Sequence, residues 1–134
     1  MAALTDHAEN LLLNFLMTTG TATRPTNWYV ALYTSAPSDS STGSSGGTEV
    51  SGNGYSRQSV SWDAASGSGG TTSNSGTVTF TASGGSFGTV THIGITDASS
   101  GGNLLWHGAM TASKTVADGD SLQFAAGAID LTIA

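Results

Sequence analysis

Residues 94–108, with the sequence GITDASSGGNLLWHG, constrain the fold of this chain more than any other segment. Two short runs of strand-forming residues, 93–96 and 104–108, flank a connection made almost wholly of turn residues. Asp97 and Asn103 can hydrogen-bond to their own backbone, and the glycines between them adopt positive φ at little steric cost. The segment therefore predicts a β-hairpin with a loop longer than two residues. It contains no nucleophile–base pair and no metal-ligand spacing, so it predicts a scaffold.

Short segments with strand character recur through the rest of the chain. Residues 28–34 (WYVALYT) are apolar on both faces, which predicts a central strand covered on both sides. Residues 77–81 (TVTFT) alternate strictly, and Val78 and Phe80 share the inward face. Further strands are expected in residues 55–62, 121–125 and 128–134. Roughly seven or eight short strands separated by turn clusters predict an all-β fold, an antiparallel β-sandwich that is jelly-roll-like.

The phase of the apolar residues also predicts an irregularity and a core. Val90 and Ile93 are out of phase by one residue, which indicates a β-bulge near residues 91–92. The inward-facing residues of the expected strands should form most of the core. They are Trp28, Leu32, Val78, Phe80, Ile93, Ile95, Leu104, Trp106, Leu122, Phe124, Ile129 and Leu131.

One N-terminal amphipathic helix is expected within residues 1–20. Asp6 followed three residues later by Glu9 is a capping pattern, and Gly20 is expected to end the helix as the C′ residue. Apolar residues recur at helical spacing along one face, at Ala8, Leu11, Leu12, Phe15 and Leu16.

The apolar arc of this helix is unusually wide, because Leu13 and Met17 extend it. Two alternatives follow: the helix packs against the sheet of its own domain, which the spacing favours, or it docks on a neighbouring subunit. The candidate assembly interface combines this arc with tyrosines of the expected strands: Leu12, Leu13, Leu16, Met17, Tyr29, Tyr33 and Tyr55.

At 134 residues the chain has the length of one domain, 1–134, with the helix in 1–20 and the sandwich in 27–134. Two long stretches rich in Ser and Gly, 36–54 and 63–76, are expected to be surface loops. The first loop is expected to carry a short edge strand at 48–50. We interpret it as an interface arm or exposed loop, because its only reactive side chains are Asp39 and Glu49.

The charge balance excludes several classes of partner. Only 9% of the residues are charged and the formal net charge is −6, with Arg24, Arg57 and Lys114 as the only Lys and Arg residues. Binding of nucleic acid or of an anionic membrane surface requires clustered cations, so neither is expected. The start of the chain has no basic run typical of a signal peptide. A surface of such low charge suits a protein that is largely covered by its neighbours.

No catalytic, cofactor-binding or metal-binding residue is predicted, and no cofactor is expected. His7, His92 and His107 have no further ligand at a spacing typical of zinc sites, and the chain has no cysteine. The sequence Asp118-Gly119-Asp120 is expected to be a β-turn rather than a calcium loop. Neither a nucleophile elbow nor a phosphate-binding loop occurs. The chain is therefore not expected to be an enzyme.

The aromatic residues allow two interpretations. The chain has three Trp and three Tyr residues, which is enough for a face on which sugars stack. Their positions in expected strands favour roles in the core or in a subunit interface instead. These residues are Trp28, Trp62, Trp106, Tyr29, Tyr33 and Tyr55.

Several segments, taken in order, resemble a family of small tailed-bacteriophage virion proteins, described as tail-fibre or minor structural proteins. The segments are AENLLLNFL, WYVALYTSAP, TEVSGNGYSRQ with the following VSW, SGTVTF, GTVTHIGITDASSGGNLLWHG and DGDSLQFAAGAIDLTI. The similarity covers about residues 8–133. The Ser/Gly-rich insertions at 38–47 and 66–75 are looser than the family pattern, so contacts made there are the least transferable.

The resemblance implies a non-enzymatic virion protein that is made in the cytoplasm of the bacterial host. It would assemble with itself and with other virion proteins of the capsid or tail through strand and helix surfaces. Two placements stay open, a tail-associated or fibre-attachment module and a capsid decoration protein. The alternative function is a host-surface glycan-binding module of the tail, which the sequence favours less.

Overall fold

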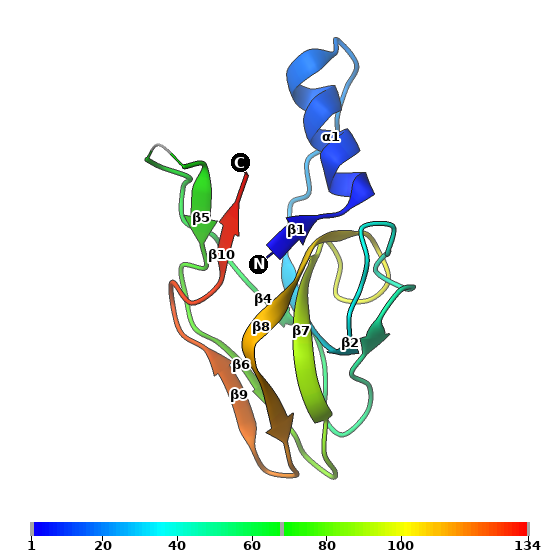
Figure 1. Cartoon of the computed structure of the whole chain (residues 1–134), viewed down its shortest axis with the longest axis vertical. Helices are drawn as coiled ribbons and strands as arrows, with labels where there is room; N and C mark the ends of the chain where they lie inside the picture. The colour runs from blue at the N-terminus through cyan, green and yellow to red at the C-terminus, as the bar shows by residue number, and fades with distance from the viewer. Residues whose placement is uncertain (1, 68, 134) are drawn as a thin grey trace.

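The computed structural model describes residues 2–67 and 69–133, which form an all-β sandwich with a single helix (Figure 1). The fold class predicted from the strand pattern is therefore confirmed as an antiparallel sandwich. In chain order the elements are β1 (Ala2–Leu4), α1 (Asp6–Met17), β2 (Tyr29–Ser35), β3 (Thr48–Glu49), β4 (Gln58–Ser59), β5 (Thr71–Ser73), β6 (Val78–Thr81), β7 (Gly88–Thr96), β8 (Leu104–Val116), β9 (Ser121–Phe124) and β10 (Asp130–Thr132).

The main sheet has the strand order β1-β8-β7-β2-β3, with β4 also paired to β2. Strands β7 and β8 form the predicted hairpin, and both are longer than the sequence pattern indicated. The Asp97 carboxylate closes the hairpin loop by accepting hydrogen bonds from the backbone N–H (2.7 Å) and side-chain amide (2.8 Å) of Asn103. Strand β2 is central as predicted, because β7 pairs on one side of it and β3 and β4 on the other.

The predicted bulge lies in the β7–β8 pair. His92 pairs with Ala109, whereas Val90 pairs with Lys114, so residues 110–113 of β8 lie opposite the single residue Thr91. An insertion of this kind increases the local bend and twist of a strand. Strand β8 accordingly curves across the sheet toward β9 (Figure 1).

Two short ribbons, β6–β9 and β5–β10, form the second layer, and the core lies between them and the main sheet. Most of the residues predicted for the core are buried there: Leu32, Val78, Phe80, Ile95, Leu122, Ile129 and Leu131. Leu104 is also buried, but outside this core cluster. The others are partly buried and pack against the same core: Trp28, Ile93, Trp106 and Phe124.

The short strands that pair with segments distant in the sequence differ from the prediction. Strand β3 lies where an edge strand was expected in the first Ser/Gly-rich loop. Strand β5 lies within residues 63–76, which were expected to be a loop throughout, and β1 precedes the helix without having been predicted. Both additional strands exist because distant partners supply their hydrogen bonds: β10 pairs with β5, and β8 pairs with β1.

Helix α1 begins and ends differently from the prediction. Its N-cap is Thr5, whose side-chain Oγ1 accepts a hydrogen bond from the N–H of Ala8, so Asp6 and Glu9 occupy the first turn instead of forming the cap. Carboxylates in that position interact favourably with the positive end of the helix dipole. The C-cap is Thr18 in an extended conformation, so Gly20 is not the C′ residue.

The helix also does not lay its apolar face on the sheet, which corrects the favoured alternative. It projects from the end of the molecule next to β1 (Figure 1). Ala8 is the only buried residue of α1. The helix contacts β1 and β8, and this leaves its later turns without cover from the sandwich. With 12 residues it is too short to span a membrane, and no other helix occurs in the described ranges.

Candidate functional site

The main apolar surface of the protein is the exposed side of α1. Leu13 is 59% exposed, Phe15 and Leu16 are 64% exposed, and Met17 is 76% exposed. We call Leu13, Leu16 and Met17 the α1 ridge; Phe15 is exposed too but lines the groove described next. Clustered exposed apolar side chains of this size mark interaction surfaces, whereas isolated ones need no explanation.

A pocket of about 330 Å³, the α1 groove, lies directly beside the ridge. One wall comes from α1 and the other from the sandwich and the segment that follows the helix. The first wall includes Leu11, Leu12 and Phe15, and the second includes Pro25, Trp28, Leu105, Trp106 and Ile133.

Ridge and groove are nearly free of charge. The acidic residues of α1, Asp6 and Glu9, lie in its first turn, and its last turn has no basic residue. Among the residues that the structure describes, Arg24 is the one charged residue that lines the groove. A partner that fits this surface must therefore be mostly apolar, because a charge buried away from Arg24 would have no counterion.

The candidate interface residues of the sequence analysis fall into two groups. Leu13, Leu16 and Met17 lie on the ridge, and Leu12 lies in the groove. Tyr29 is partly exposed on β2. Tyr33 is only 2% exposed and Tyr55 packs on the core, so neither offers a surface to a partner.

Tyr33, which is buried, and Tyr55, which is partly buried, surround a charged group that the sequence analysis missed. The Tyr55 hydroxyl donates to Glu49 Oε1 (2.8 Å) and accepts from the N–H of Leu32 (3.1 Å). Its ring stacks on Phe80 at a centroid distance of 6.0 Å. Burial raises the pKa of Tyr33 to about 12, and burial likewise raises the pKa of Tyr55.

Arg57, which is 8% exposed, forms a bidentate ion pair with Glu49. Its Nε lies 2.8 Å from Glu49 Oε1 and its Nη2 lies 2.9 Å from Oε2. The hydrogen bond that Arg57 donates to Glu49 is the main reason that the pKa of Arg57 is raised, against the opposing effect of burial. The guanidinium also donates to Thr96 Oγ1 at the end of β7. It donates further to the carbonyl of Gly43 in the first Ser/Gly-rich loop and to those of Ala98 and Gly101 in the hairpin loop.

This cluster holds the first Ser/Gly-rich loop against the β7–β8 hairpin loop. No buried side-chain nitrogen or oxygen of the described residues lacks a hydrogen-bond partner. A buried arginine satisfied in this way is a structural clamp and has no open position for a substrate. The signal in the sequence was the segment TEVSGNGYSRQ, in which Glu49, Tyr55 and Arg57 occur together.

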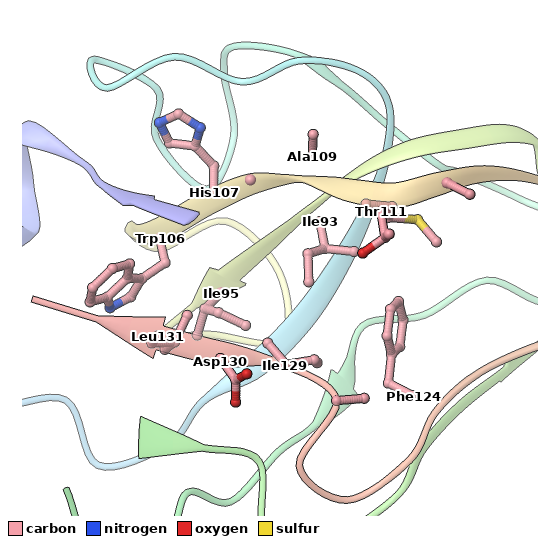
Figure 2. A pocket seen from close by; sticks show the side chains of 14 residues that line it. Ile93, Ile95, Trp106, His107, Ala109, Thr111, Phe124, Ile129, Asp130 and Leu131 are labelled. Atoms are coloured by element: carbon pink, nitrogen blue, oxygen red, sulfur yellow. The ribbon is translucent and has the colours of Figure 1, made fainter. Parts of the chain in front are cut away.

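The largest of the described pockets, about 360 Å³, lies between β8 and the β9–β10 region (Figure 2). Its lining is mostly apolar and includes Ile93, Trp106, Phe124, Ile129 and Leu131. The titratable residues His107 and Asp130 lie on different sides of this pocket, and the His107 ring is directed away from it (Figure 2). They do not form an acid–base pair.

The histidines make contacts typical of structural residues. His107 Nε2 lies 2.8 Å from Asp39 Oδ1, which links the first loop to β8. His92 Nδ1 lies 2.8 Å from Thr91 Oγ1. Within residues 2–67 and 69–133, no three His, Asp or Glu side chains are grouped as metal ligands would be.

Comparison with known families places this exposed helix and sandwich in a defined group of proteins. Residues 3–132 match the model of the family described as Podophage GP4 fiber I protein gp80. The chain belongs to this family. A search of curated proteins found no match. Membership confirms the resemblance to phage tail-fibre structural proteins and identifies the chain as a virion component. The match begins at residue 3 and includes α1, so the helix is part of the family pattern.

Proposed function

We propose that this chain is a non-enzymatic building block of a phage fibre and that it self-associates through α1. The observation that carries the proposal is the exposure of the α1 ridge (Leu13, Leu16 and Met17) and of Phe15 in the groove, on a helix that its own sandwich leaves largely uncovered. Each large apolar side chain contributes about 1.5–3 kcal/mol when it is fully buried. Leaving four such residues in water therefore forgoes a substantial part of the stability available to the assembled protein.

The shape of the surface favours a second copy of this chain as the occupant. The ridge and the groove lie on the same helix, so two copies related by a closed symmetry can each insert a ridge into the groove of the other. An apolar helix lying in an apolar groove is a common recognition mode. Both surfaces are nearly uncharged, and the two copies therefore match in polarity as well as in shape.

The family description favours a position in a fibre over one on the capsid lattice, and a structural role over catalysis. The core supports treating residues 1–134 as one domain, because β2, β6, β7, β9 and β10 all contribute to it. Cryo-electron microscopy and quantitative gels of purified virions test the position. Copies confined to tail fibres support the proposal, and copies on the icosahedral lattice would make the protein a capsid decoration protein.

Self-association is tested by sedimentation velocity and light scattering on the full chain over a range of concentrations. We expect the wild-type chain to form a discrete oligomer, and the double variant Leu16→Gln/Met17→Gln to sediment as a monomer. The matched control is Asn10→Gln/Asn14→Gln, which alters exposed polar residues of the same helix and should remain oligomeric.

Two results would refute the proposal. The wild-type chain could be monomeric at every concentration, or the Leu16→Gln/Met17→Gln variant could remain as oligomeric as the control. Circular dichroism and urea unfolding of each variant verify that the sandwich is intact. The substituted side chains are exposed, so we expect no loss of stability in the monomer.

A further inference from the structure

All three tryptophans of the chain line one pocket. Trp28 precedes β2, Trp62 follows β4, and Trp106 lies in β8. The pocket has a volume of about 320 Å³, within the range of small-molecule sites, and we call it the tryptophan pocket. Its remaining lining residues are Ile95, Leu105, Leu131, Asp63, Ala65 and Thr72.

Backbone pairing fixes the position of each tryptophan. The carbonyl of Trp28 accepts a hydrogen bond from the N–H of Val60 (2.9 Å). Trp62 forms an isolated β-bridge with Asn74, and Trp106 pairs with Ile95 of β7. Side chains that project from paired backbone form more rigid sites than side chains on free loops. Figure 2 shows Trp106 beside Leu131 and Ile95, at the end of the molecule where β1 and β10 approach β8.

The indole N–H groups of the three tryptophans are not used within the described part of the protein. A buried tryptophan N–H normally has a protein partner. In the described ranges none of the three indole nitrogens donates to a protein group, and no buried side-chain nitrogen lacks a partner. The nitrogens are therefore accessible to solvent. All three residues are only partly exposed, so each presents part of its ring to the pocket.

Asp63 adds a hydrogen-bond acceptor at the edge of the pocket. Its backbone is held on both sides, because its N–H donates to the carbonyl of Ser73 (2.9 Å) and its carbonyl accepts from Thr72 Oγ1 (2.5 Å). Its side chain is exposed, and no described residue hydrogen-bonds to the carboxylate. The pocket lining thus combines three indole rings with one acidic residue, Asp63.

We propose that the tryptophan pocket binds a neutral saccharide unit. A pyranose ring has an apolar C–H face that can lie on an indole and hydroxyl groups that can bond to Asp63 and to the indole N–H groups. A purely apolar ligand would remove water from the Asp63 carboxylate without replacing its hydrogen bonds. An anionic ligand would be repelled by this carboxylate and by the net charge of −6.

The spacing of the rings distinguishes a saccharide from a cationic ligand. A quaternary ammonium group is bound by aromatic rings clustered around one centre. The close aromatic pairs in the described structure involve Tyr55, Phe80, Phe87 and Phe124, and no tryptophan belongs to one. Three separated indoles form a broad surface that suits a sugar ring and its neighbour in a chain.

This inference goes beyond the proposed structural role, and the two can be tested separately. Trp28 and Trp106 line both the tryptophan pocket and the α1 groove, whereas Trp62 and Asp63 line the tryptophan pocket but not the groove. The informative variants are therefore Trp62→Ala and Asp63→Asn. The matched control is Tyr29→Ala, which truncates a partly exposed aromatic residue outside the pocket.

The experiment uses the full-length chain and a panel of methyl glycosides of neutral hexoses, deoxyhexoses and N-acetylhexosamines, with choline as the cationic probe. Binding is followed by tryptophan fluorescence and by saturation-transfer NMR. We expect at least one glycoside to bind saturably and Trp62→Ala to weaken it by about tenfold or more, with a smaller loss for Asp63→Asn. Tyr29→Ala should leave affinity unchanged, and the oligomeric state of Trp62→Ala and Asp63→Asn should be that of the wild-type chain.

Three outcomes would overturn the inference. No glycoside could give saturable binding, the affinity could be insensitive to Trp62→Ala, or choline could bind in preference to every sugar. A change of oligomeric state in Trp62→Ala would indicate instead that the pocket is covered by a second copy of the chain. Thermal unfolding of each variant shows that a loss of binding is not a loss of folding.

Discussion

Replacing Arg57 with alanine tests whether the buried ion pair clamps the loops of this protein. The substitution removes both bonds to Glu49 and the bonds to the carbonyls of Gly43, Ala98 and Gly101. Breaking a buried pair by removing one partner costs about 3–5 kcal/mol, because the other charge loses its compensation.

The structure places the expected loss of stability in Arg57→Ala at the lower end of this range. The Arg57 side chain is 3% exposed, whereas that of Glu49 is 26% exposed, so water can partly solvate the remaining carboxylate. We therefore expect the free energy of unfolding to fall by about 3 kcal/mol. For a domain of this size that corresponds to a decrease in Tm of about 10 °C.

Urea unfolding followed by tryptophan fluorescence measures this loss. Arg57→Lys should recover only part of it, since an ammonium group cannot make the bidentate contact with Glu49. The control is Arg24→Ala, which removes the same charge from an exposed position and should change stability by less than about 0.5 kcal/mol.

A double-mutant cycle that combines Arg57→Ala with Glu49→Ala isolates the interaction energy of the ion pair. We expect a coupling energy of about 1–3 kcal/mol between positions 49 and 57. A loss below about 1 kcal/mol in Arg57→Ala, or the same loss in Arg24→Ala, would refute the clamp.

Three further predictions concern the core, the helix cap and the buried tyrosines. Phe80 is 2% exposed and contacts Tyr55 and Phe124, so Phe80→Ala should cost about 3–5 kcal/mol in urea unfolding, and near-neutral stability would contradict its place in the core. The hydroxyl of the fully buried Thr5 caps α1 and donates to the carbonyl of Leu104 (2.5 Å); Thr5→Ala should cost about 1–2 kcal/mol, and Thr5→Ser should recover most of it. The pKa of Tyr33 is raised to about 12, so the folded state holds its proton after the unfolded state has lost it, and stability should fall as pH rises from about 10 to 12. Tyr33→Phe should make that fall shallower in urea unfolding at each pH, and an unchanged slope would contradict the assignment.

The local elements could be predicted because their causes are local. Asp97, Asn103 and the glycines between them determine the loop between β7 and β8 through their own backbone preferences. Strict alternation in residues 77–81 identifies the buried face of β6, and the phase change near residue 91 identifies the bulge. Each of these signals lies within a few residues of the feature that it predicts.

The pairing of strands that lie far apart in the sequence was harder to predict. Strand β1 is only Ala2–Leu4 and strand β5 is Thr71–Ser73, and neither has an apolar pattern of its own. They become strands because β8 and β10 offer backbone hydrogen bonds to them. Tyr33 and Tyr55 were assigned to an interface for a similar reason, since the Glu49–Arg57 pair beside them forms only in the folded chain.

The sequence by itself determined the all-β class, the hairpin, the bulge, most of the core and the presence of an apolar helix, because turn chemistry and side-chain periodicity act over short distances. Only the tertiary structure decided that α1 stands away from the sheet and that Trp28, Trp62 and Trp106 share one pocket. Periodicity shows that a face is apolar but not what covers it. The convergence of distant residues depends on which strands pair, and pairing is decided by the whole chain at once.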